Sequence, residues 1–430
     1  MINIPKGTNE RLAIHGGAPV IDSSRAKFEW PRITDQVRLA VKNQLLDTIS
    51  IYDNSNIFGE FEKRFARYHS RKYAQLSNSG TSSIFAMYEA INVLPGDEIL
   101  CPVYTFHATV SPMMYLGATP VFCDSDDDGN IAFDDIKHKV TNKTKAIVVT
   151  HMWGRPARDI LEISKLCKDR GIYLLEDCSH SHGAMIYGKR TGSFGDIAAW
   201  SLQGQKTVTG GEGGILTTDN KNLYDRALLQ GHYNKRPKIE LSDNSALKKF
   251  SLTGMGLKLR AHPLAIAIAN EQFNHLEEFI ETRQKYAKML NRALLEYDFL
   301  DLPDTNSAKN SWYAYCIKYR GGERHGVAKR RFVEALTKEG LIEIDIPGST
   351  GLLNNLPLFC HPDQILPRMY NKGLRKQDGF PVARRFVDQL IKMPVWSFGD
   401  EEWIIDKYIA GFRKVCNYIQ QNDGGLLRGN

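Results

Sequence analysis

Between residues 73 and 201 the chain alternates short apolar segments with helix-like ones, and this alternation limits the possible folds more than any other feature. The apolar segments lie at 98–101, 119–123, 146–150 and 172–175. Strands that are apolar along their whole length, separated by amphipathic segments, are typical of a parallel sheet covered by helices on both faces. We therefore expect an α/β fold in which the carboxyl ends of several strands meet at one edge of the sheet.

The length of 430 residues favours two domains, because a single hydrophobic core rarely grows to that size. We expect an irregular N-terminal arm over 1–30, a large α/β domain over 31–285 and a smaller α+β domain over 286–430. A long helical stretch from Pro263 to Tyr297 is expected to join the two domains. Beyond it we expect strands at 312–319 and 341–345, and helices at 327–338, 382–391 and 400–420.

Composition and charge argue against several classes of protein. No run of about 18 apolar residues occurs, so no transmembrane helix is expected, and residues 1–10 lack the apolar core of a signal peptide. The seven cysteines are scattered and form no Cys-x-x-Cys pair, which favours reduced thiols and a cytoplasmic location. The net charge of +7 is mild, so we expect neither a nucleic-acid nor a membrane partner. The basic stretch 232–238 is expected to be a mobile loop, with charges that are either solvated or suited to receive an anionic substrate.

Two predicted strand ends carry groups suited to a phosphate and to a planar ring. Ser79-Gly80-Thr81-Ser82 lies between a strand and a helix, where free N–H groups and hydroxyls form an anion site. The same residues equally suit an ordinary helix N-cap. Phe106 follows the strand that ends at Cys101, and its ring is suited either to stacking on a heterocycle or to a place in the core.

A third predicted strand ends in a carboxylate. Asp177 lies at the rim of the sheet, where a partly desolvated carboxylate needs a cationic or hydrogen-bonding partner such as a protonated ring nitrogen. Cys178, His180 and His182 offer a metal site as the alternative, because all three are metal-ligand types. Their i, i+2, i+4 spacing matches no standard zinc pattern, and no second ligand cluster accompanies them.

A single lysine follows the fourth strand end. Lys206 lies between the apolar segment 197–201 and the glycine-dense turn 210–214, a position suited either to Schiff-base chemistry or to a solvated lysine. An anion site, a stacking aromatic ring, a carboxylate and a lysine at one sheet edge have one simple explanation, pyridoxal phosphate (PLP). This cofactor needs a phosphate site, a lysine for the imine, and an acid that keeps its pyridine nitrogen protonated.

In the order and separation of these segments, the chain resembles the DegT/DnrJ/EryC1/StrS family of PLP-dependent aminotransferases. The resemblance extends over roughly residues 12–420 and rests on Ser79-Gly80-Thr81, Pro102 to Phe106, Glu176-Asp177, and Ser201 with Lys206 before Gly211-Glu212-Gly213-Gly214. It implies fold-type I, with a mostly parallel seven-stranded sheet between helices and a smaller C-terminal domain. It also implies a homodimer whose active sites are shared between the subunits.

The resemblance assigns a role to each residue around the cofactor ring. It implies that Lys206 forms the Schiff base, that Asp177 pairs with the pyridine nitrogen and that Phe106 stacks on the ring. His180 stands where many members have a glutamine near the phenolic oxygen of the cofactor, and a histidine can make the same hydrogen bond.

The resemblance also implies a phosphate site that includes the partner subunit. Gly80, Thr81 and Ser201 would hold the phosphate from within one chain. Many members add an asparagine from a Gly-x-Asn-x-Arg segment of the partner, but the corresponding stretch here, 256–260, has Lys258 in its place. Lys258 would contact the phosphate as a point charge.

The activity implied is the transfer of an amino group from glutamate or glutamine to a keto-sugar, often nucleotide-linked, or to a keto-cyclitol. Such reactions supply amino sugars, polysaccharides or secondary metabolites, and pyridoxamine phosphate carries the amino group between the two halves. One alternative is a sugar dehydratase of the same family, in which a histidine replaces the catalytic lysine; Lys206 argues against it. A non-catalytic PLP-binding regulatory protein and a metallohydrolase using Cys178, His180 and His182 are the others.

Overall fold

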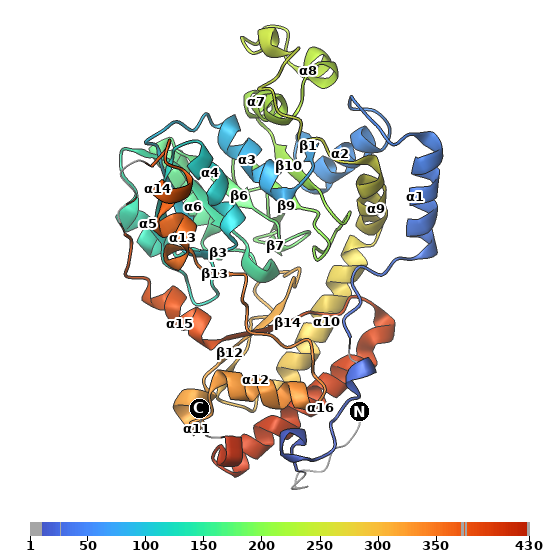
Figure 1. Ribbon diagram of the computed structural model, residues 1–430, viewed down its shortest axis with the longest axis vertical. Coiled ribbons are helices and arrows are strands. Elements are labelled where there is room, and N and C mark those ends of the chain that lie inside the picture. Colours follow the sequence, from blue (N-terminus) through green and yellow to red (C-terminus); the bar gives the residue numbers. More distant parts are fainter. Residues whose placement is uncertain (1–10, 26, 371–373, 375, 428–430) are drawn as a thin grey trace.

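The computed structural model describes residues 11–25, 27–370, 374 and 376–427. A seven-stranded sheet forms the upper part of the molecule in the view of Figure 1. Its strands, in spatial order, are β1 (Tyr73–Ser77), β10 (Gly214–Thr218), β9 (Ile197–Ser201), β6 (Tyr173–Asp177), β5 (Thr144–Thr150), β2 (Glu98–Pro102) and β4 (Thr119–Cys123). The strands from β9 to β4 run parallel, whereas β10 runs antiparallel to both β1 and β9. The expected mostly parallel α/β sheet is confirmed.

Helices cover both faces of this sheet, as the apolar strands require. In β5, Ala146 and Val148 join a core that includes residues of α3 (Gly80–Ala90) and α7 (Lys221–Gly231). Ile147 and Val149, which point to the opposite face, join a core that includes residues of α6 (Ile160–Arg170). Because successive side chains of a strand alternate between faces, a strand buried on both sides must be apolar throughout.

A smaller part of the molecule lies below the large sheet in Figure 1. It holds a three-stranded antiparallel sheet, β11 (Leu300–Asp301), β12 (Tyr315–Tyr319) and β14 (Leu390–Met393), with α10 (Leu276–Leu294), α12 (Lys329–Lys338) and α16 (Glu402–Gln421). These elements share one hydrophobic core.

The helical stretch expected from Pro263 to Tyr297 is two helices, α9 (Pro263–Asn274) and α10, which meet at His275. The predicted domain boundary at residue 285 falls inside α10 and stays a prediction.

The prediction of a strand at 341–345 is wrong. Only Asp345 of this segment forms a β-bridge, to Lys392, while the residues before it form a turn that follows Gly340, whose φ is +96°. The buried Leu341 contacts the position of Gly411 in α16, so packing against that helix overrides the β propensity of the segment.

Most of the remaining elements are short or lie at the edges. The principal ones among the described residues are α1 (Asp35–Asp47), α2 (Asn56–Tyr68), α4 (Ser111–Tyr115), α5 (Phe133–Lys139), α8 (Lys235–Glu240), α11 (Gly321–His325), α13 (Pro357–Cys360), α14 (Pro362–Ile365), α15 (Pro381–Gln389), the pairs β3 (Tyr104–Thr105) with β13 (Gly351–Leu352) and β7 (Met185–Ile186) with β8 (Lys189–Arg190), and the 3₁₀ turns η3 (His107–Thr109) and η4 (Met152–Gly154).

The basic stretch 232–238 is not a mobile loop. Part of it belongs to α8, and Arg236 is buried there, where it donates hydrogen bonds to the carboxylates of Glu62 and Glu240. None of the described helices is long and apolar enough to cross a membrane.

The N-terminal arm runs along the smaller part of the molecule. The backbone N–H of Ile21 donates to the carbonyl of Glu339 over 3.1 Å, and the N–H of Phe28 donates to the carboxylate of Glu343 over 2.8 Å. These bonds bring Trp30, at the end of the arm, against the edge of the large sheet, where its indole N–H reaches the carbonyl of Lys206 over 3.0 Å.

Candidate active site

A cavity of about 860 Å³ lies at the carboxyl ends of β6 and β9, between the large sheet and the smaller part of the molecule. Seven of the eight residues predicted for the site line it: Gly80, Thr81, Phe106, Asp177, His180, Ser201 and Lys206. The eighth, Lys258, is exposed and does not line this cavity. Strands that end at the same edge bring the seven together from positions up to 126 residues apart, the separation of Gly80 and Lys206.

Asp177 is the last residue of β6 and is 7% exposed. One carboxylate oxygen accepts a hydrogen bond from the hydroxyl of Thr109 over 2.7 Å, and the other accepts from the backbone N–H of Ser179 over 3.0 Å. A carboxylate has about four acceptor sites, so it keeps capacity for a donor in the cavity. This is the arrangement that a protonated ring nitrogen needs.

The turn between β1 and α3 forms the helix N-cap predicted for it and also leaves backbone N–H groups suited to the predicted anion site. Ser79 caps α3 by accepting a hydrogen bond from the N–H of Ser82 over 3.1 Å. The N–H groups of Gly80 and Thr81 precede the first hydrogen bond that a helix makes along its own backbone, so they are available to an anion. A Cβ atom on Gly80 would lie 2.6 Å from the Cβ of Ser201. Only glycine allows this close approach, which brings the Ser201 hydroxyl beside the helix N-terminus.

Lys206 is held by its backbone on a turn. Its N–H donates to the carbonyl of Gln203 over 2.8 Å, while its carbonyl accepts from Trp30. The side-chain nitrogen lies 4.6 Å from the centre of the Tyr313 ring. Burial lowers the pKa of the Lys206 amine to about 8, although the carboxylate of Asp177 acts in the opposite direction. An amine with this pKa is a better nucleophile and base near neutral pH than an exposed lysine.

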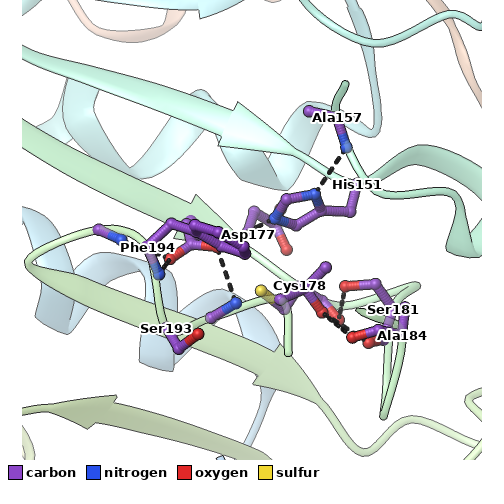
Figure 2. A network of polar contacts seen from close by, with 12 residues as sticks. His151, Ala157, Asp177, Cys178, Ser181, Ala184, Ser193 and Phe194 are labelled. Carbon is purple, nitrogen blue, oxygen red and sulfur yellow. Dashed lines mark hydrogen bonds and ion pairs between the residues drawn. The ribbon is translucent and has the colours of Figure 1, made fainter. Parts of the chain in front are cut away.

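Glu176, the residue before Asp177, accepts a set of buried hydrogen bonds near the end of β6. The buried carboxylate of Glu176 accepts hydrogen bonds from the N–H groups of Gly192, Phe194 and Gly195, over 2.6 to 2.8 Å, and from His151 over 3.1 Å. Burial alone would raise the pKa of Glu176, but the hydrogen bond from His151 and the neighbouring charge of Arg71 help to hold it below its usual value. Figure 2 shows this network of polar contacts around the strand that ends at Asp177.

The metal site considered as an alternative is not formed. In the described part of the chain, the one group of potential ligands that converges is His151, Glu176 and Cys178, and it includes neither His180 nor His182. The carboxylate of Glu176 is already bound by four donors, and the free ring nitrogen of His151 accepts from the N–H of Ala157. Burial raises the pKa of the Cys178 thiol well above its usual range, so the thiolate that binds metals is disfavoured.

His180 lies among aromatic rings contributed by other segments. Its ring stacks on that of Tyr313, with centroids 3.9 Å apart and planes 5° apart, and lies 5.6 Å from Trp153. Burial, together with the positive charge of Lys206, lowers the pKa of His180 well below its usual value, so the ring is neutral. A neutral imidazole has one donor and one acceptor nitrogen, as a partner of a phenolic oxygen requires.

Sequence reasoning missed Thr109, Trp153, Arg283 and Tyr313, all of which line the cavity. Arg283, in α10, is buried and donates to the hydroxyls of Thr207 over 2.9 Å and of Ser397 over 2.8 Å. Neither Tyr313 nor Arg283 follows the end of a strand of the large sheet, so no local sequence signal identifies them. Thr109 does carry a weak signal, because it follows Phe106 in the same loop.

These residues fit PLP. The cavity offers free helix N-terminal N–H groups and a hydroxyl for a phosphate, a carboxylate with spare acceptor capacity for a pyridinium, and an amine with a lowered pKa for the carbonyl carbon. Phe106 lines the cavity and is available for stacking, since 40% of its surface is accessible.

Comparison with known proteins agrees with this donor set. The sequence pattern of the DegT/DnrJ/EryC1/StrS aminotransferase family matches residues 34–405. GDP-perosamine synthase of Escherichia coli O157:H7 is 34% identical over 251 residues, which cover 58% of this chain and 66% of that protein, just under two thirds. GDP-perosamine synthase of Caulobacter vibrioides is 30% identical over 404 residues, which cover 92% of this chain and 99% of that protein.

A solved structure supports the fold independently. The X-ray structure of the aminotransferase from Psychrobacter cryohalolentis superposes with a TM-score of 0.78. The superposition covers 90% of this chain and 98% of that one, at 24% sequence identity.

Proposed function

Because the chain belongs to the DegT/DnrJ/EryC1/StrS aminotransferase family and its cofactor is PLP, we propose that it moves an amino group from glutamate or glutamine to a keto-sugar or keto-cyclitol. The observation that carries the proposal is the shared cavity of Lys206 and Asp177. An amine with a pKa near 8 and a carboxylate with spare acceptor capacity are the two groups that this reaction requires.

PLP, when bound, supplies the electron sink that stabilises negative charge at the carbon next to the transferred amino group. Asp177 would hold a proton on the pyridine nitrogen and so keep that sink strong. The side-chain nitrogen of Lys206 would accept a proton from the substrate carbon next to the transferred amino group and return it, and its lowered pKa leaves a useful fraction in the basic form. Gly80, Thr81 and Ser201 would hold the phosphate.

The nature of the acceptor is supported by both the relatives and the cavity. The two curated relatives described above are GDP-perosamine synthases, whose name places a nucleotide-linked amino sugar among their products. In this chain the wall opposite the sheet carries Glu343, Asp345 and Lys392, which can hydrogen-bond the hydroxyls of a sugar or cyclitol. We therefore favour a nucleotide-linked keto-sugar over a free cyclitol.

We also propose a homodimer with shared active sites, and α1 supports it. This helix buries only Val37 and Gln44, while Leu39, Leu45 and Leu46 are each more than half exposed. An apolar helix face of this kind marks an interface. A second copy is the partner we assign to it, because the exposed Lys258 does not line the cavity of its own chain.

The proposal is tested with purified protein loaded with PLP. Wild type is expected to show a visible absorption band that borohydride bleaches, and to transfer the amino group of glutamate or glutamine to a keto-sugar. Lys206→Ala is expected to lose both the band and turnover, while the matched variant of the exposed Lys189, Lys189→Ala, keeps both. An active Lys206→Ala protein would overturn the assignment.

The same assay separates the alternatives. A sugar dehydratase would release a deoxy-keto product and free ammonia, because removal of the hydroxyl is a two-electron reduction that consumes the amino donor, so the product sugar would carry no nitrogen from that donor. A regulatory protein would show the absorption band but no turnover with any acceptor.

A further inference from the structure

The carboxylate of Asp177 is buried, and its two oxygens are bound by neutral donors, the hydroxyl of Thr109 and the N–H of Ser179. A buried carboxylate that relies on neutral donors depends strongly on each of them, because it has little water to replace a lost hydrogen bond. Thr109 is itself only 1% exposed. Its hydroxyl therefore has a large effect on how the carboxylate is oriented.

The direction of the hydrogen bonds around Thr109 follows from the chemistry of the groups. A carboxylate can only accept, so the hydroxyl of Thr109 donates its single proton to Asp177. The hydroxyl of Thr105 lies 2.9 Å from that of Thr109. Because Thr109 has already used its proton, Thr105 is the donor in this contact. The result is a one-directional chain from Thr105 through Thr109 to Asp177, in which each bond strengthens the next.

The backbone fixes both threonines in place. The buried hydroxyl of Tyr88 donates to the carbonyl of Thr109 over 2.6 Å and so holds the η3 turn. Thr105 belongs to β3, where it is paired with Gly351 of β13 from the C-terminal part of the chain. Next to this pair, the N–H of Leu353 donates to the carbonyl of Val103 over 2.8 Å. The chain of hydroxyls therefore begins at the seam between the two parts of the molecule and ends at Asp177.

We propose that Thr109 is a positioning residue for the aminotransferase reaction: its hydroxyl, supported by Thr105, holds the Asp177 carboxylate in the orientation that keeps the cofactor's pyridine nitrogen protonated. The proposal rests on the function proposed above. Thr109 acts through Asp177 and takes no part in bond making. Its removal should weaken the electron sink more than it weakens the binding of substrates.

The test uses the full-length protein loaded with PLP that carries ¹⁵N in the ring, whose NMR shift reports protonation of the pyridine nitrogen. Thr109→Val keeps the shape of the side chain but removes the hydroxyl, and we expect a measurable loss of protonation at pH 8 together with a fall in kcat. A hydrogen bond to a charged group is worth about 1.5–3 kcal/mol, so the fall in kcat should be roughly 10- to 100-fold. KM for the amino donor should change much less than kcat.

Three further variants make the result specific. Thr109→Ser restores the hydroxyl and should recover protonation and most of kcat. Thr105→Val removes the supporting donor and should give an effect between wild type and Thr109→Val. Thr217→Val is the matched control, because this threonine is equally buried but its hydroxyl has no hydrogen-bond partner in the described part of the chain.

The possible results distinguish failure of the role of Thr109 from failure of the proposed function. If wild type shows a protonated ring nitrogen and Thr109→Val shows the same shift and kcat, the role of Thr109 is refuted while the proposed function stands. If wild type binds no PLP or leaves the nitrogen unprotonated, both proposals fail. If Thr109→Val does not fold, Thr105→Val decides, and its equality with wild type would refute the chain of hydroxyls.

Discussion

The amine of Lys206 lies in a cavity where it contacts little water, and this desolvation destabilises the charged form of the side chain. With a pKa of about 8, roughly a tenth of the amine is uncharged at pH 7, whereas an exposed lysine is almost wholly charged. Asp177 opposes this effect, so the balance between burial and one carboxylate sets the reactivity of the site.

The lowered pKa can be measured without the cofactor. We expect reductive methylation of Lys206 in the PLP-free protein to follow a titration with a midpoint near pH 8. Quantitative mass spectrometry of the modified peptide gives the midpoint, and the exposed Lys189 provides the comparison within the same sample. A midpoint for Lys206 as high as that of Lys189 would contradict the effect of burial.

A second titration belongs to a carboxylate outside the cavity. Burial and the neighbouring charge of Asp128 raise the pKa of Asp126 to about 7, against the opposing charge of Arg158. Between the pKa of an exposed aspartate, about 4, and 7, the folded state binds more protons than the unfolded state, so stability falls as pH rises. The slope from this group is at most about 1.4 kcal/mol per pH unit.

Asp126→Asn should remove that slope. The amide keeps the oxygen that accepts from the N–H groups of Asp128 and Asn130. Urea unfolding at pH 5 and pH 8 should therefore show a smaller stability difference in the variant than in wild type. The exposed neighbour Asp127 provides the control, since Asp127→Asn should leave the difference unchanged. An unaltered slope in Asp126→Asn would show that the carboxylate titrates normally.

At the scale of elements, the Lys206 turn is held from two sides. The N-terminal arm contributes Trp30, which binds the carbonyl of Lys206, and α10 contributes Arg283, which binds the hydroxyl of Thr207. The guanidinium of Arg283 also lies 5.0 Å from the ring of Trp30. Two elements far apart in the sequence thus fix one turn of the large sheet.

Substitutions of these two residues should differ in severity. Trp30→Phe removes one hydrogen bond, worth about 1 kcal/mol, and should weaken PLP binding by a few-fold. Arg283→Met leaves the hydroxyls of Thr207 and Ser397 without their donor and should destabilise the protein by about 2–4 kcal/mol. Thermal unfolding and titration with PLP measure both effects. Trp403→Phe, at a half-exposed tryptophan, is the control and should change neither quantity.

Much of the large sheet and its site was predictable because the information is local. Apolar segments identify β2, β4, β5 and β6, and the end of a parallel strand identifies Asp177 without further data. The antiparallel direction of β10 in the sheet and the pairing of β3 with β13 were not predictable, since both depend on contacts between distant segments. For the same reason the predicted strand at 341–345 was wrong.

The residues of the site also differ in whether a local sequence signal or a contact between distant segments places them. Gly80 and Phe106 follow strands of the large sheet and were found from the sequence. Tyr313 and Arg283 enter the cavity from the other part of the molecule, and only packing between the two parts places them there. The roles given to the predicted residues, and a cytoplasmic location, stay predictions.

At the scale of the whole molecule, α1 presents an apolar face that this chain leaves uncovered. Leu46 is 77% exposed, and Ile49 and Tyr52 beyond the helix are 57% and 55% exposed. An uncovered face of this kind in an isolated chain is explained if a second copy buries it.

Leu46→Glu should therefore shift the protein from dimer to monomer and reduce turnover, because a shared active site needs both chains. Light scattering during gel filtration measures the mass. Leu295→Glu is the control, since Leu295 is 78% exposed on the smaller part of the molecule. A wild-type protein that is monomeric at all concentrations would contradict the dimer.

One wall of the cavity is attached by backbone hydrogen bonds as well as by an ion pair, in which Lys392 Nζ lies 2.9 Å from Asp345 Oδ2. Asp345 and Lys392 exchange two main-chain hydrogen bonds, over 2.8 and 2.9 Å, and both side chains line the cavity. Backbone bonds do not depend on the identity of the side chain, so we expect this wall to keep its place when the two residues, and with them the ion pair, are replaced. For enzyme engineering, a library randomised at these two positions would vary acceptor preference on a constant scaffold, with the cofactor-binding edge of the sheet untouched.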